Sequence, residues 1–428
     1  MNHGAARPLR VLVVAAHEPW PLDGGGRLRL YNYLRGLSSA ADVTLALPEP
    51  VQHAGHMPAG LRTADMSAGS ARRHLPQHTR PWVARRVERH FGANPAVRRW
   101  LQRHAVPPEF DVTLLHGAVT GQYVDAVRVP VVWDAVDELV LYTVRDAVRG
   151  GARCWWRAGR AAALYALFER YVARRAQATI FASSVDASYA RRWAGATRIE
   201  TISNGVDFRY FAAHTRPPTP GTVAFVGSLS FPPNVEGITR FARHIWPRLH
   251  ATAGHRLLIV GRAPTPAVRA LAELPGVELH ADVPDVRPYV AEAGVVIVPT
   301  RLGGGVKNKV LEACALRRPV VASPRALAGL SARRGRDVLC ATNDGAWVRH
   351  ITHLLANPVA AERVARHGYE WVRREHNWSH ITDRLLQVLS DAAGVTARWP
   401  VPPRDVVEDN AAWRARSDVR QSCAPVTV

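Results

Sequence analysis

The sequence predicts an α/β protein in which two doubly wound domains, each built on a parallel sheet, face each other across a cleft. Short runs of mostly β-branched residues, bounded by turn residues, alternate along the chain with longer stretches of helical character. This alternation is typical of βα units whose helices cover both faces of a parallel sheet. The chain has 428 residues, whereas single hydrophobic cores stop growing at roughly 250–300 residues. Two domains are therefore expected.

The first series of βα units predicts an N-terminal domain over residues 1–211. Helices are expected at Arg27–Leu37 and Ala161–Arg175. Strands are expected at Val11–Ala16, Val43–Leu47, Val112–Leu115, Val131–Trp133, Thr179–Ala182 and Thr201–Ser203. The proline-rich segment 212–221 interrupts the pattern and is predicted to be a linker.

The second series predicts a C-terminal domain over residues 222–379. A closing helix is expected at 380–391, with its helical pattern clearest over His380–Leu389. The tail 392–428 is rich in Pro, Arg and Asp and lacks periodicity, so we expect a peripheral or disordered extension. Strands of this series are expected at Thr222–Val226, Leu257–Val260, Val277–Leu279, Val295–Val298, Pro319–Ala322 and Val338–Cys340.

Composition excludes several classes of protein. Four scattered cysteines fit neither a disulfide framework nor a zinc site, which favours a reducing compartment. The apolar run Val11–Ala16 is shorter than the core of a signal peptide, and no run approaches the ~18–20 apolar residues of a membrane span. We therefore expect a cytoplasmic protein.

The formal charge of +21, from 56 basic and 35 acidic residues, raises the question of an anionic partner. Basic residues between Arg72 and Arg103 are interleaved with Trp82, Phe91 and Trp100. Such a segment could bind nucleic acid or dock on an anionic membrane at the inner face. Because arginine is the generic charged residue of this chain, a solvated helical face is the favoured reading, and no nucleic-acid partner is expected.

The strongest local signal follows the expected strand Val295–Val298. Gly303, Gly304 and Gly305 leave backbone N–H groups uncovered, and a helix expected to start near Val306 adds its own unpaired N–H groups. Arg301 and the chain's only two lysines, Lys307 and Lys309, supply positive charge at this point. Glu312 lies on the same helix face as Lys309. The alternative is a glycine turn that merely caps an ordinary helix, in which Glu312 pairs with Lys309. The combination of glycines, lysines and strand end favours a nucleotide-diphosphate site.

A second glycine-rich loop lies between the first strand and the first helix of the N-terminal domain. Its sequence, Asp23-Gly24-Gly25-Gly26, would bring backbone close to a phosphate across the cleft. Alone it could be a flexible turn. Together with the loop in the other domain it indicates a phosphate site between the domains.

At this point the chain resembles a known family, glycosyltransferase family 4. The resemblance runs from about Arg10 to Leu389, and it is nearest to bacterial sugar transferases associated with exopolysaccharide synthesis. The motifs that carry it are Asp23-Gly24-Gly25-Gly26, Ser203-Asn204-Gly205-Val206-Asp207 with Phe211, Val226-Gly227-Ser228-Leu229 with Pro233-Asn234, and Lys309-Val310-Leu311-Glu312-Ala313-Cys314-Ala315 with Pro319-Val320-Val321.

The resemblance implies the GT-B fold, with two Rossmann-like domains, and transfer of a sugar from a nucleotide-diphosphate donor with retention of configuration. It implies no cofactor and no metal, and it leaves open whether the acceptor is lipid-linked or a polysaccharide. It assigns the ribose to Glu312 and places His116, with Asp134 and Asp137 behind it, near the transferred sugar. The other donor-binding residues it implies are Gly25, Gly26, Arg301, Gly304, Gly305, Val306, Lys307, Lys309, and Asp282 with Val283 near the base.

Two positions depart from the family pattern. Gly304 stands where the family usually carries a glutamate, and Ser228 and Glu236 stand where basic residues are common. Neutralisation of the phosphates should therefore depend more on Arg301 and the two lysines. Gly304 keeps open a non-catalytic GT-B binding protein. A nucleotide-sugar epimerase or hydrolase of the same fold is the other alternative.

Overall fold

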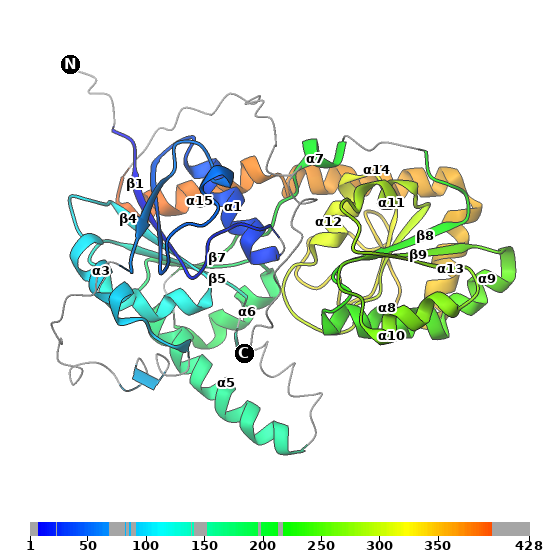
Figure 1. Ribbon diagram of the computed structural model, residues 1–428, viewed down its shortest axis with the longest axis horizontal. Coiled ribbons are helices and arrows are strands. Elements are labelled where there is room, and N and C mark those ends of the chain that lie inside the picture. The colour runs from blue at the N-terminus through cyan, green and yellow to red at the C-terminus, as the bar shows by residue number, and fades with distance from the viewer. Residues whose placement is uncertain are drawn as a thin grey trace.

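A computed structural model of the protein describes residues 7–22, 24–67, 82, 85, 86, 91–137, 139, 140, 152–195, 198–212 and 217–395. Two parallel sheets, each flanked by helices, form two lobes that lie side by side (Figure 1). The first sheet has seven strands in the order β3-β2-β1-β4-β5-β6-β7, and the second has six in the order β10-β9-β8-β11-β12-β13. The predicted fold class, two doubly wound domains, is confirmed.

The N-terminal sheet contains one strand that the sequence did not predict. Its residues, Arg62–Asp65, are mostly exposed at the sheet edge and lack an apolar run. The last strand ends at Thr201, so the expectation of a strand over Thr201–Ser203 was wrong by two residues. The elements are β1 (Arg10–Ala15), α1 (Gly25–Leu37), β2 (Asp42–Leu47), η1 (Ala54–His56), β3 (Arg62–Asp65), α3 (Pro95–His104), β4 (Val112–His116), η3 (Ala118–Ala126), β5 (Val131–Val136), α5 (Ala152–Ala173), β6 (Ala178–Phe181), α6 (Ser184–Trp193), β7 (Ile199–Thr201) and α7 (Phe208–Ala212).

The C-terminal sheet is buried on both faces, as its continuous apolar strands predict. The strands expected at Thr222–Val226 and Val295–Val298 have those bounds in the structure. The elements are β8 (Thr222–Val226), α8 (Pro232–His244), α9 (Trp246–Ala253), β9 (Arg256–Gly261), α10 (Pro266–Arg269), η4 (Ala270–Glu273), β10 (Val277–Ala281), α11 (Arg287–Glu292), β11 (Val295–Val298), α12 (Asn308–Ala315), β12 (Val320–Ala322), β13 (Leu339–Cys340), α13 (Asp344–Ala356), α14 (Pro358–Glu375) and α15 (Trp378–Ala393).

The last helix, α15, returns to the N-terminal domain. It packs against α1, β4 and β5 rather than against the second sheet, so the sequence placed it in the wrong series (Figure 1). The fit is close, because a Cβ atom placed on Gly36 of α1 would lie 2.4 Å from the Thr382 side chain. The chain therefore crosses between the domains twice, once before β8 and once before α15.

Ligands of doubly wound sheets bind beyond the carboxyl ends of the strands, where the strand order reverses. These reversals lie between β1 and β4 in the first sheet and between β8 and β11 in the second. The glycine loops at Gly24–Gly26 and Gly303–Gly305 follow β1 and β11, so both lie at these positions.

Two expectations fall largely outside the described residues. Most of the basic segment between Arg72 and Arg103 and the tail beyond residue 395 are not described. None of the described helices combines the length and the hydropathy needed to cross a bilayer.

Candidate active site

The loop between β11 and α12 supplies the C-terminal half of the site. The helix begins at Asn308, two residues after the predicted start near Val306, because the backbone of Lys307 at the N-cap is extended. Gly303 and Gly305 have φ values of 89° and 69°, a region that glycine enters without strain. Backbone N–H groups of this loop and the unpaired N–H groups of α12 meet here, which favours an anion.

Lys309 projects from α12 toward the end of β8. Its Nζ donates to Oδ1 of Asn234 at 2.8 Å and lies 4.6 Å from the centre of the Phe225 ring. A Cβ atom placed on Gly227 would lie 2.6 Å from this Nζ and 2.8 Å from Nδ2 of Asn234, so a side chain at this position would displace one of them. Burial lowers the pKa of Lys309 to about 7, with a further lowering from Lys307 and opposition from Glu312.

The other two cations of the loop are held more loosely. Lys307 Nζ donates to the carbonyl oxygen of Gly304. The Arg301 guanidinium is 57% exposed and lies 3.6 Å from Oε1 of Glu236, the acid that stands where the family pattern has a basic residue. Glu236 therefore offsets part of the charge of Arg301, and a bound diphosphate would compete with it for the guanidinium.

Glu312 shares a small cavity with Lys309. This space, about 10 Å³, is also lined by Phe211, Val226 and Val286. Its walls are mostly apolar, and its volume is that of about one water molecule. The predicted ribose ligand and the predicted diphosphate ligand are thus brought together on one face of α12.

The predicted base-binding residues lie at the edge of the domain. Asp282 follows β10, is exposed, and its Oδ1 accepts a hydrogen bond from the Ala263 amide at 2.7 Å. Val283 is half-buried and packs against the main hydrophobic core. The carboxylate of Asp282 is therefore used to hold two strand ends together.

A larger groove opens beside the loop. It has a volume of about 780 Å³ and runs past the ends of β11, β12 and β13. Arg301 is the one predicted site residue that lines it, and other lining residues include Arg240, Asp344 and Trp347. Arg240 and Asp344 form an ion pair of 2.7 Å, so the groove is polar but largely neutral on that side.

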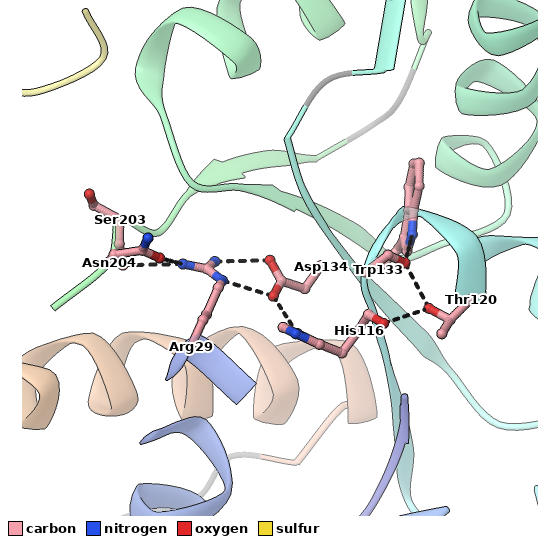
Figure 2. A network of polar contacts seen from close by, with 8 residues as sticks. Arg29, His116, Thr120, Trp133, Asp134, Ser203 and Asn204 are labelled. Atoms are coloured by element: carbon pink, nitrogen blue, oxygen red, sulfur yellow. Dashed lines mark hydrogen bonds and ion pairs between the residues drawn. The ribbon is translucent and has the colours of Figure 1, made fainter. Parts of the chain in front are cut away.

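The N-terminal half of the site is a buried charge network (Figure 2). Arg29 of α1 donates from Nε and Nη2 to the two oxygens of Asp134, each at 2.9 Å. His116, at the end of β4, places Nδ1 2.9 Å from Oδ2 of the same carboxylate. Since a carboxylate only accepts, Nδ1 carries a proton and donates it to Asp134.

We call this network closed, because its charged groups pair with one another and are shielded from solvent. Arg29 and Asp134 are fully buried and His116 is 7% exposed. Burial raises the pKa of Asp134, but Arg29 and His116 outweigh it and lower that pKa to about 2. Burial also lowers the pKa of Arg29, and the negative charge of Asp134 more than reverses this. His116 is therefore held by an ionised partner in one orientation, with a proton on Nδ1.

Hydrogen bonds connect the two halves of the site. Nη1 of Arg29 donates to Oδ1 of Asn204 at 3.0 Å, and Nδ2 of Asn204 donates to Oδ1 of Asn308 at 3.0 Å. A Cβ atom placed on Gly25 would lie 3.6 Å from Nδ2 of Asn308, so the predicted N-terminal glycine loop lies against the start of α12. Gly26 follows in the first turn of α1 and is exposed.

Four residues of the site were not assigned roles from the sequence: Arg29, Asn204, Asn234 and Asn308. Asn204 and Asn234 lie within motifs that carried the family resemblance, so their roles could have been sought there. Arg29 had no such signal, because it is one of 54 arginines. Asn308 lies between the two lysines and carries no charge or motif that would mark it in the sequence.

Comparison with known proteins supports this description. Residues 220–357 match the family model "Glycosyl transferases group 1". No curated protein sequence matches the chain.

Several solved structures share the fold over nearly the whole chain. Sucrose-phosphate synthase from Thermosynechococcus elongatus is 17% identical, with a TM-score of 0.65 over 90% of this chain and 98% of its own. Anabaena HepE, in complex with UDP and glucose, is 14% identical, with a TM-score of 0.60 over 90% and 100%. The α,α-trehalose 6-phosphate synthase of Burkholderia multivorans is 13% identical, with a TM-score of 0.59 over 91% and 99%.

At these identities the structures show a shared fold, GT-B. This fold and the family match over residues 220–357 together support the assignment of the chain to the GT-B glycosyltransferases.

Proposed function

We propose that the protein transfers a sugar from a nucleoside-diphosphate sugar to an acceptor hydroxyl, with retention of configuration. The observation that carries the proposal is the pairing of two unlike half-sites. One half is a glycine loop with Arg301, Lys307 and Lys309. The other half is His116, which the buried carboxylate of Asp134 orients. The first suits a diphosphate, and the second suits the uncharged sugar attached to it.

The residues divide the work in this scheme. Glu312 accepts hydrogen bonds from the ribose diol, while Lys309 and the N–H groups of Gly305, Val306 and Lys307 bind the diphosphate. Arg301 and Gly304 complete that loop, and Gly25 and Gly26 approach the phosphates from the other domain. Val283, with Asp282 beside it, borders the base. The Nε2 edge of His116 forms a hydrogen bond with a hydroxyl of the sugar.

The main contribution of the protein to this reaction is electrostatic stabilisation of the transition state. As the bond between the sugar and the diphosphate breaks, negative charge grows on the leaving phosphate, and preorganised N–H groups and cations stabilise it. The acceptor hydroxyl attacks from the same face that the phosphate leaves, which retains the configuration. Because the loop itself supplies positive charge, we expect transfer to continue in EDTA, and we assign no cofactor.

Crystal structures of Anabaena HepE contain UDP, UDP with glucose, and UDP-glucose. UDP-sugars are therefore the first donors to try. The acceptor we favour is a lipid-linked or polysaccharide intermediate, met at the cytoplasmic membrane face.

A ligand panel tests the proposal. Thermal shift with UDP, GDP, ADP and a short DNA oligonucleotide should show stabilisation by at least one nucleoside diphosphate and none by DNA. The stabilising nucleotide is then supplied as its sugar donors, with and without acceptor extracts. Stabilisation by DNA alone would overturn the proposal in favour of a binding protein. Consumption of donor without any acceptor-dependent product would favour a hydrolase or epimerase.

A further inference from the structure

The two segments that cross between the domains lie against each other. One follows β7 and includes residues 204–206, and the other joins α14 to α15 and includes residues 376 and 377. The amide of Val206 donates to the carbonyl oxygen of His376 at 2.8 Å, and Val206 pairs with Asn377 in a parallel β-bridge. The two crossings therefore form one joint between the domains.

The side chain of His376 is buried in this joint. It is 2% exposed, and its ring packs edge to face against Trp371, with ring centres 5.0 Å apart. Burial lowers the pKa of His376, against the opposing effects of Asn204 and Glu375, so at pH 7 the ring is mostly neutral and carries one proton. That proton is on Nδ1, because Nδ1 lies 2.8 Å from the carbonyl oxygen of Asn204, which only accepts.

The other ring nitrogen of His376 makes no such contact. Nε2 is buried and has no hydrogen-bond partner among the residues that the structure describes. A buried polar atom without a partner costs stability, so an apolar side chain would suit this position better if packing were its only role. The hydrogen bond to Asn204 is therefore what the structure gains from a histidine here.

Asn204 depends on this bond because the next residue is Gly205. A Cβ atom placed on Gly205 would lie 2.6 Å from Cδ2 of Trp378, so a side chain at this position would displace the first residue of α15. Glycine leaves the adjoining backbone free to take many conformations. The hydrogen bond from His376 fixes the orientation of the peptide group between Asn204 and Gly205, which the local sequence does not fix.

The side chain of Asn204 joins the two halves of the site. Its Oδ1 accepts a hydrogen bond from Arg29 of the closed network at 3.0 Å (Figure 2). Its Nδ2 donates to Oδ1 of Asn308, at the start of α12, also at 3.0 Å. Rotation of the Asn204 peptide group would move this amide and weaken both bonds at once.

We propose that His376 is a positioning residue for the transfer reaction. It touches no substrate in the proposed scheme, and it acts by holding the carbonyl of Asn204, whose amide places the two halves of the site against each other. The inference rests on the proposed glycosyltransferase function and adds to it a residue outside the donor-binding loops. A donor that spans both halves should therefore bind more weakly when this hydrogen bond is lost.

Two amide variants distinguish the two ring nitrogens. In His376→Asn the amide nitrogen takes the position of Nδ1, whereas in His376→Gln it takes the position of Nε2. Isothermal titration with UDP-glucose, GDP-mannose and ADP-glucose identifies a sugar nucleotide that the wild type binds, and that one is used for all variants. We expect His376→Asn to bind it within twofold of the wild type. We expect His376→Gln and His376→Leu to bind it about 5- to 10-fold more weakly, within the range for loss of one neutral hydrogen bond.

A double-mutant cycle with Asn204→Ala separates positioning from a purely structural role. Without the Asn204 amide there is nothing for His376 to place, so Asn204→Ala/His376→Leu should bind the sugar nucleotide within twofold of Asn204→Ala. The thermal midpoint should instead fall by the same amount when His376→Leu enters either background, because the carbonyl of residue 204 loses its donor in both. If His376→Leu does not fold, His376→Gln takes its place in the cycle.

His380→Leu is the matched control, because His380 is exposed on α15. Its affinity should equal that of the wild type. Additive losses of affinity in the cycle, wild-type affinity in both His376→Leu and His376→Gln, or equal weakening by the Asn and Gln variants would each overturn the role of His376. Failure of the wild type to bind any of the three sugar nucleotides would instead overturn the proposed function, and the inference with it.

Discussion

The two halves of the candidate site handle charge in opposite ways. In the N-terminal half, Arg29, Asp134 and His116 satisfy one another and are almost completely buried. In the C-terminal half, Arg301 is 57% exposed, and Lys309 is held by the neutral amide of Asn234 rather than by a carboxylate. The first half is organised before any ligand arrives, whereas the second has positive charge to offer to an anion.

This difference predicts where substitutions act. Removal of one partner from a network of buried charges leaves the other charge buried and unpaired, which lowers the free energy of unfolding. A lightly paired cationic loop contributes little to stability and much to ligand binding. Variants in the two halves should therefore separate stability from activity.

Arg29→Met should have the largest effect on stability. It leaves Asp134 buried without its guanidinium partner, and we expect a loss of about 3–5 kcal/mol in the free energy of unfolding of the N-terminal domain. Chemical denaturation followed by tryptophan fluorescence would measure it. The double variant Arg29→Met/Asp134→Leu should recover part of the loss, because both charges are then absent. A single variant as stable as the wild type would contradict a closed network.

Lys309→Gln and Glu312→Ala should show the opposite behaviour. We expect transfer to fall about 10²- to 10³-fold for Lys309→Gln, as when one preorganised group that stabilises developing charge is removed. For Glu312→Ala the loss should appear mainly as a higher KM for the donor. Both variants should keep the wild-type thermal midpoint within a few degrees. Arg248→Gln and Glu362→Ala, at exposed positions of α9 and α14, are the matched controls. Wild-type turnover in both site variants would refute the site.

The lowered pKa of Lys309 predicts proton uptake on binding. With a pKa of about 7, Lys309 is mostly neutral at pH 8 in the free protein. The diphosphate of a nucleotide sugar favours the charged form and raises this pKa, so binding at pH 8 should take up most of one proton. By linkage, affinity should fall as pH rises above 7, until the pKa of the bound state is passed.

Titration calorimetry at pH 8 in two buffers of different ionisation enthalpy would count the protons taken up. The nucleotide sugar is the suitable probe, since its diphosphate has no group that titrates in this range. The uptake should disappear in Lys309→Gln and persist in Arg248→Gln. Uptake of the same size in Lys309→Gln would assign the proton to another group.

The same contrast explains what the sequence could and could not predict. The C-terminal loop was predictable because its glycines, cations and Glu312 lie within twelve positions, next to a clear strand. The N-terminal network is assembled from residues far apart in the chain: Arg29 lies 105 positions from Asp134 and 175 from Asn204. Periodicity shows that a helix buries one face, but it does not show which partner meets a charged residue there.

Smaller errors have similar physical causes. The strand β3 lies at the edge of the sheet and its side chains are mostly exposed, so its sequence lacks the apolar run that marks a buried strand. Helix α15 has a strong amphipathic pattern, but the pattern does not specify which of two sheets the apolar face covers. Of the predicted site residues, Asp282 was placed by its position after a strand, and the structure uses its carboxylate to hold the Ala263 amide.

The hydrogen bond between Asn204 and Asn308 joins the two halves, and it gives the smallest predicted effect. Each half is organised by its own contacts, so loss of this bond should shift their relative placement without unfolding either. We expect Asn308→Ala to lower kcat/KM for the donor about 2- to 12-fold, the range for one neutral hydrogen bond. Since Asn204 also accepts from Arg29, Asn204→Ala should cost more. A double-mutant cycle of the two alanine variants, with kcat/KM as readout, isolates the bond. A coupling energy near zero would mean that the closed network and the cationic loop act without this link.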